Sequence, residues 1–108
     1  EMSFKIIDVP GALEIPVVLE NFKSNYTGFI IIGCIIRGET SHFDAVKDTV
    51  MSCIYNIVIK KRLPLGLSLL TVENYEQALK RSSSKDKINS GSHAAEVCYK
   101  MIKILKKK

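Results

Sequence analysis

The segment Arg37–Asp44 carries the residue types that a phosphate-binding, proton-transferring site needs. It follows an apolar run and precedes an amphipathic stretch, so we expect it to lead from a buried strand into the N-terminus of a helix. Free N–H groups and the positive end of the helix dipole favour an anion there, and Gly38 lets the backbone approach a ligand closely. His42 can transfer protons near neutrality. The segment predicts an anion site beside a proton-transfer histidine; a helix cap or a surface histidine is the alternative.

Two other segments could contact a ligand. Small residues in Val9–Pro16 leave space at a turn, and Glu14 could accept hydrogen bonds from hydroxyl groups. An ordinary tight connection with an acid in the first helical turn is the alternative. Lys80 and Arg81 stand near a serine-rich loop, and an arginine offers a planar fork for phosphate. A solvated basic loop would have the same composition.

The elements that must position these residues follow from hydrophobic periodicity. Strands are expected at 4–9, 29–36 and 65–71, and helices from 12, over 43–61, over 74–80 and from 92. Residues 29–36 are apolar without alternation, which is typical of a strand covered on both faces. Alternating strands and helices predict one domain over residues 1–108, of the α/β class, with a parallel sheet flanked by helices. Ligands bind beyond the carboxyl ends of such strands, where the segments 10–14, 37–42 and 71–74 leave the sheet.

Composition restricts the class of protein further. The chain has 108 residues and a net charge of +5, and that excess equals the lysines at 100, 103, 106, 107 and 108. We interpret these lysines as a solvated helix end, with contact to nucleic acid or acidic lipid as the alternative. The longest apolar run is too short to cross a membrane and no signal peptide is visible, so a cytoplasmic protein is expected. Cys34, Cys53 and Cys98 are expected to be reduced and mostly buried, and no metal site is expected.

Three motifs, taken together, resemble the bacterial lumazine synthase family. They are Val9–Pro16, Gly33–Asp44, and Leu70–Ala78 followed by Arg81, in this order and nearly evenly separated. The resemblance covers essentially the whole chain and implies a flavodoxin-like, layered α/β/α fold. It also implies a transferase of riboflavin biosynthesis, which condenses 5-amino-6-(D-ribitylamino)uracil with 3,4-dihydroxy-2-butanone 4-phosphate to 6,7-dimethyl-8-ribityllumazine. The family needs neither a metal nor an organic cofactor.

The resemblance implies a role for each matching residue. His42 matches the proton-transfer histidine, and the phosphate-binding residues are Glu39, Thr40 and Arg81. The residues matching the ribityl-uracil site are Ala12, Leu13, Glu14, Cys34, Ile35 and Ile36, joined by Leu67 from a neighbouring subunit. The implied partners are the small-molecule substrates and further copies of the chain. Pentamers or multiples of pentamers with sites between subunits are expected, without nucleic acid or membrane.

The sequence departs from the family pattern in three places. The family begins with a strand and a helix, on the order of 30 residues, that this sequence does not contain. We therefore expect an N-terminally shortened chain, in which strands 4–9 and 29–36 either pair directly or leave the core open. His93 stands where the family has an acid near the catalytic histidine, and Ser82–Ser84 replaces a glycine-containing loop.

Two other functions are compatible with the sequence. The first is a non-catalytic remnant or assembly subunit of the same family, which would keep the surface but lack a complete pocket. The second, more remote, is a flavodoxin-like binding domain such as a phosphoacceptor receiver. A receiver needs an acidic cluster at the strand ends, where this sequence offers Asp8, Arg37 and Thr71.

Overall fold

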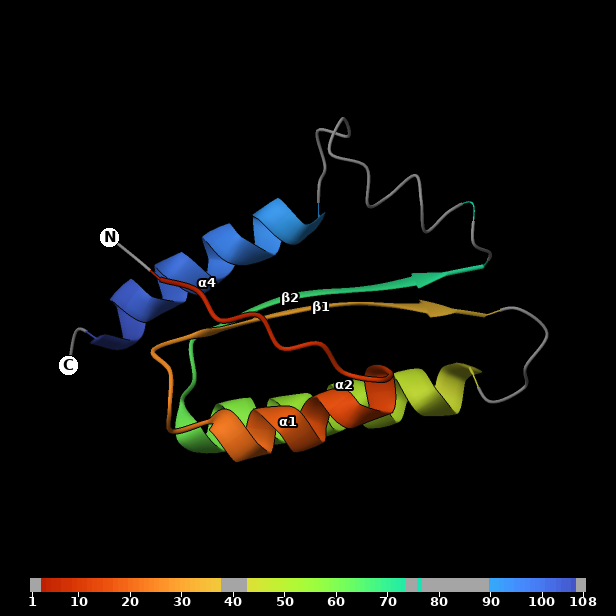
Figure 1. Ribbon diagram of the computed structural model, residues 1–108, viewed down its shortest axis with the longest axis horizontal. Helices are drawn as coiled ribbons and strands as arrows, with labels where there is room; N and C mark the ends of the chain where they lie inside the picture. The colour runs from red at the N-terminus through yellow and green to blue at the C-terminus, as the bar shows by residue number, and fades with distance from the viewer. Residues whose placement is uncertain (1–2, 38–42, 74–75, 77–89, 107–108) are drawn as a thin grey trace.

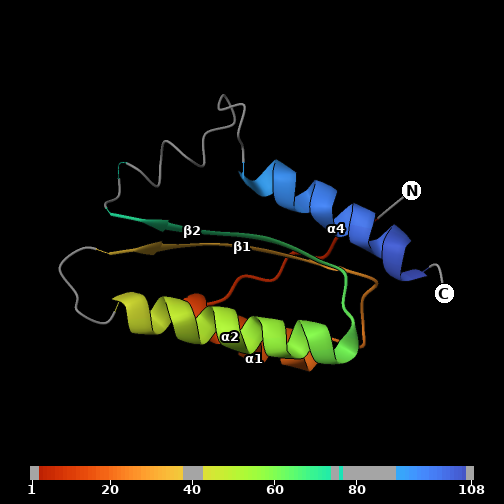
Figure 2. The ribbon, with the colours of Figure 1, turned by 180° about the vertical axis from the view of Figure 1, so that it is seen from behind.

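The computed structural model in Figure 1 describes residues 3–37, 43–73, 76 and 90–106. A two-stranded sheet lies between a pair of helices on one face and a single helix on the other, and Figure 2 shows the same layers from behind. In chain order the elements are η1 (Ala12–Glu14), α1 (Ile15–Phe22), β1 (Phe29–Ile36), α2 (Phe43–Lys61), β2 (Leu65–Val72) and α4 (Ser90–Lys106). The predicted α/β architecture with a parallel sheet is confirmed. No helix in the described part of the chain is both long and apolar enough to span a bilayer.

Strands β1 and β2 pair in parallel along their full lengths. Phe29 lies opposite Leu65 and Ile36 lies opposite Val72. The backbone bonds continue past both ends, because Phe29 N donates to Pro64 O at 2.9 Å and Arg37 N donates to Val72 O at 2.8 Å. The strands therefore run side by side to their carboxyl ends, where the predicted ligand site should lie.

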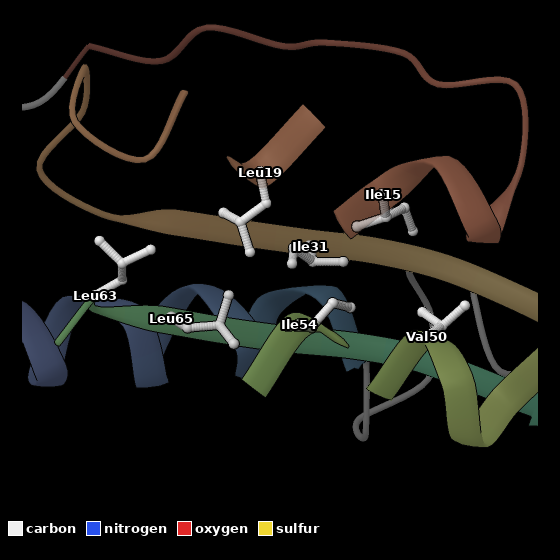
Figure 3. Packing of buried hydrophobic residues seen from close by; sticks show 7 residues of the cluster. All are labelled: Ile15, Leu19, Ile31, Val50, Ile54, Leu63 and Leu65. Atoms are coloured by element: carbon white, nitrogen blue, oxygen red, sulfur yellow. The ribbon is translucent and has the colours of Figure 1, made fainter. Parts of the chain in front are cut away.

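The main core lies between the sheet and the α1–α2 pair (Figure 3). Val50 and Ile54 of α2 are fully buried, and Ile15 and Leu19 project from successive turns of α1. With Ile31, Leu63 and Leu65 they form one apolar cluster. The helix predicted over 43–61 is confirmed. Its three- and four-residue spacing of apolar residues places Val50 and Ile54 on the face toward the sheet.

On the opposite face, α4 approaches the sheet closely because two glycines leave it room. A Cβ at Gly66 would lie 1.7 Å from the carbonyl oxygen of Ala94, and one at Gly28 would lie 2.9 Å from Cys98 Sγ. Cys98 Sγ is 3.9 Å from Pro64 O, a long sulfur–oxygen contact. Burial raises the pKa of the Cys98 thiol, so this cysteine is a packing residue in its neutral form.

Three expectations from the sequence are wrong. Residues 3–9 form no strand: Phe4 and Ile6 are exposed, and no backbone ladder joins this segment to β1. Apolar β-branched residues favour a strand only when a neighbouring strand accepts their hydrogen bonds. Strand β1 is not covered on both faces, because α4 lies mainly over β2 and leaves Ile32 68% exposed. Cys34 is exposed for the same reason. Cys53 on α2 is exposed as well, so of the three cysteines expected to be mostly buried only Cys98 is buried.

The remaining element boundaries are close to those expected. Helix α4 begins at Ser90 rather than near 92, and the first helix begins at Ala12 as a 3₁₀ turn that continues into α1. Pro16 stands in the first turn of α1, where its missing N–H leaves no intrahelical bond unmade. The helix expected over 74–80 lies, apart from Glu76, outside the described residues.

The end of α2 is closed by Arg62 in a left-handed backbone conformation. Its φ is 53°, and among the described residues it is the one non-glycine residue with a positive φ. Leu63 N donates to Val58 O at 3.0 Å and Arg62 N to Ile59 O at 3.4 Å, which is the bonding pattern of a Schellman cap. Glycine is the usual residue at this position because it has no Cβ to strain.

Arg62→Gly is therefore expected to stabilise the protein. Relief of the left-handed strain should raise the free energy of unfolding by about 1 kcal/mol, measured by urea denaturation. The matched control is Lys61→Gly, one residue earlier within the helix, which should lower it by a similar amount. A lower urea midpoint for Arg62→Gly would show that the cap is not strained.

Candidate active site at the carboxyl ends of the strands

The turn that enters α1 lies against β1. Segment η1 packs on both β1 and α2, and Glu14 N donates to Gly11 O at 3.1 Å to close the turn. Gly33 of β1 leaves room for a side chain of the paired strand: a Cβ there would lie 2.9 Å from Leu69 Cδ1, whereas Ile15 Cδ1 of α1 would be at an ordinary contact distance of 3.6 Å. The sequence motifs include Gly33, but this packing role could not be seen without the contact to Leu69.

Two groups of predicted substrate-contacting residues thus lie on adjacent elements. Ala12 packs on the apolar core, whereas Leu13 is 50% exposed and the Glu14 side chain is exposed. Oε1 of Glu14 would lie 3.0 Å from a Cβ at Gly11, so the carboxylate lies beside the glycine of the turn. A carboxylate in this position can accept hydrogen bonds from a hydroxylated ligand.

The end of β1 presents alternate side chains to its two faces. Ile35 is buried toward α1 and α2, whereas Cys34 and Ile36 are exposed on the face that α4 leaves open. The backbone at this end remains paired with β2 as far as Arg37. A ring bound over Cys34–Ile36 would therefore meet an ordered backbone and apolar side chains.

Leu67 is separate from these groups within one chain. It pairs with Ile31, three positions before the Cys34–Leu70 pair, and it packs on the apolar core. Three strand residues correspond to about 10 Å. Leu67 is therefore about 10 Å along the sheet from Cys34 in its own chain.

For the other predicted site residues, the structure describes only the elements on either side of them. His42, Glu39, Thr40 and Arg81 lie outside the described residues. Their flanks are described: Arg37 follows β1 at the carboxyl edge of the sheet, and α2 begins at Phe43 with Asp44 in its first turn. His93 is exposed in the first turn of α4. Within the described ranges, no group of three or more histidine, cysteine, aspartate or glutamate side chains could hold a metal ion.

Comparison with known proteins gives a consistent result. The family model described as 6,7-dimethyl-8-ribityllumazine synthase matches residues 1–106. The chain is similar to a protein of that name from Bartonella tribocorum, with 44% identity over 99% of this chain and 72% of the relative. Relatives of the same name from Bartonella henselae and Agrobacterium fabrum are 40% and 39% identical, and the matches span 71% and 75% of their lengths.

Proposed function

The chain belongs to the 6,7-dimethyl-8-ribityllumazine synthase family, and we propose how its residues carry out the reaction that gives the family its name. The enzyme is a transferase of riboflavin biosynthesis. It condenses 5-amino-6-(D-ribitylamino)uracil with 3,4-dihydroxy-2-butanone 4-phosphate. The packing of η1 against β1 supports the residue assignment, because the predicted ribityl contacts belong to one of these elements and the predicted uracil contacts to the other.

We assign the ribityl-uracil to the surface formed by η1 and the end of β1. Glu14 accepts hydrogen bonds from the ribityl hydroxyls, and the backbone of Cys34–Ile36 meets the pyrimidine. Ala12 and Leu13 bound the space beside it. The half-exposed Leu13 supports this assignment because it presents apolar surface beside the end of β1.

The phosphate substrate is assigned to the loop after β1. Glu39 and Thr40 stand just before the N-terminus of α2, where free N–H groups favour an anion, and Arg81 supplies a fork for the phosphate oxygens. The amine of the uracil attacks the ketone and one water is lost as the imine forms, phosphate then leaves, and ring closure releases a second water. His42 moves the protons that these steps require.

We further propose that the protein works as a pentamer or a multiple of pentamers, with Leu67 reaching the site of an adjacent subunit. The described surface supports an assembly, because it exposes large apolar side chains, including Val17, Ile59 and Ile104. The bacterial relatives are consistent with a cytoplasmic bacterial enzyme. Sedimentation velocity would measure the assembly; a monomer at the assay concentration would contradict the shared site.

The test of function is lumazine formation by His42→Ala. Proton transfer by a positioned side chain contributes about 10²–10⁴-fold to the rate. The turnover number of His42→Ala should therefore fall by a factor within this range. The rate is followed by lumazine fluorescence above the uncatalysed background. An unchanged rate would remove His42 from the mechanism.

His93→Glu is the companion variant. A carboxylate should orient a neighbouring imidazole better than a second imidazole does, so the rate should stay the same or rise. If the unaltered protein shows no rate above background, the chain is a non-catalytic member of the family.

A further inference from the structure

A cavity of about 370 Å³ lies at the end of the molecule opposite to the proposed active site. Lys60, Lys61, Arg62 and Leu105 line it. Helix α2 starts at the carboxyl edge of the sheet and returns to the amino edge, where β2 begins at Leu65 (Figure 1). Leu105 belongs to the last turn of α4, so the ends of two helices that are far apart in sequence meet around this space.

The charge around the cavity exceeds what the helix ends require. Each helix C-terminus carries about half a negative charge, and basic residues there are ordinary. Three cationic side chains line the cavity, and none of the lining residues in the described part of the chain is acidic. Lys103, on the last turn of α4, lies 4.5 Å from the centre of the Tyr99 ring, so its ammonium already has a partner. The three lining cations therefore leave a net positive potential after the helix dipoles are counted.

The backbone conformation of Arg62 adds an independent observation. A left-handed φ of 53° is unfavourable for a residue with a Cβ, and the cap itself needs only the N–H groups of Arg62 and Leu63. Glycine would form the same cap without strain. Arg62 thus combines a strained backbone with a side chain that lines the basic cavity, and strain of this kind is often found at functional sites.

We propose that this cavity binds a compact anion with two or more phosphoryl groups, of the diphosphate class. The hollow is open to solvent and its three cationic residues are exposed, so charge rather than enclosure would hold the ligand. A guanidinium pairs with two phosphate oxygens at once, while the two lysine ammonium groups act as point charges on the remaining oxygens. A nucleic-acid strand would need a groove that follows its backbone and stacking aromatic rings, whereas the lining here is one apolar and three cationic side chains.

The proposed site is distinct from the proposed phosphate site of the reaction, and the experiment must separate them. We suggest calorimetric titration of the protein with inorganic diphosphate, in the Arg81→Ala background, which removes the predicted phosphate arginine. One binding event should remain, and its affinity should fall as salt is added, because exposed charges are screened.

Two variants remove cations from the cavity. Arg62→Gly and Lys60→Gln should each weaken diphosphate binding by about tenfold, which corresponds to one charge-assisted hydrogen bond. Arg62→Gly keeps the cap, so loss of binding cannot be attributed to unfolding. The control is Lys47→Gln, on the same helix but 13 residues earlier and about 20 Å away, and it should leave the affinity unchanged.

Three outcomes would overturn the proposal. The first is no binding in the Arg81→Ala background. The second is equal affinity in Arg62→Gly and the control. The third is tight binding of single-stranded RNA that diphosphate does not displace, which would make the basic end a nucleic-acid surface instead.

Discussion

Gly66→Ala is expected to destabilise the protein more than the same substitution at Gly33, the other glycine in the paired strands. Gly66 is buried in β2 directly beneath α4, and the new Cβ would lie 1.7 Å from Ala94 O and 2.6 Å from the carbonyl carbon. These are backbone atoms, so no side-chain rotation relieves the overlap. Helix α4 must move away, and that movement opens the packing of Ala94 and Cys98, both of which are buried.

Overpacking in a well-packed core costs about 1–3 kcal/mol, and this clash lies at or above the upper end. That is a large part of a total stability of about 5–15 kcal/mol. Urea denaturation should show a much lower midpoint. Gly11→Ala is the control, since its Cβ would meet only Oε1 of the flexible Glu14 side chain at 3.0 Å, and it should cost little. Equal midpoints for the two variants would mean that α4 does not pack this closely on β2.

Arg81→Ala is expected to give the largest loss of activity. The proposed role of Arg81 is to hold the phosphate of the four-carbon substrate while that group leaves, and removing one such donor costs about 10²–10³-fold in rate. Steady-state lumazine formation should therefore lose kcat/KM for the butanone phosphate, while KM for the uracil changes little. Lys80→Ala, the adjacent cation, is the matched control. Equal losses for both substrates would contradict the assignment of Arg81 to phosphate.

Local pattern was sufficient to predict the central elements. The bounds of β1 and α2 agree with those expected from an uninterrupted apolar run and from a long three- and four-residue repeat. Both patterns can be recognised from consecutive residues. Strand pairing cannot, because it depends on a partner elsewhere in the chain. Residues 4–9 have the composition of a strand but form none, since no neighbouring strand pairs with them.

The same distinction separates what could be predicted about the site. Residue identities at Ala12–Glu14 and Cys34–Ile36 came from the family motifs, and the packing of η1 on β1 agrees with a common location. The role of Gly33 depends on where Leu69 lies, which no spacing rule gives. The left-handed conformation of Arg62 could not be predicted from the sequence either, because such a cap is normally recognised by a glycine.

The register of the sheet has a consequence for how the chain folds during synthesis. Phe29 pairs with Leu65, 36 positions later, so β1 has no partner until β2 has left the ribosome. At about 5–20 residues per second, this delay lasts about 2–7 s. A helix forms within microseconds, so α2, which ends at Lys61 just before β2 begins at Leu65, can shield one side of the nascent β1 during the last part of the wait. The buried Val50 and Ile54 of α2 thus protect an eight-residue apolar segment from other nascent chains before they contribute to the finished core.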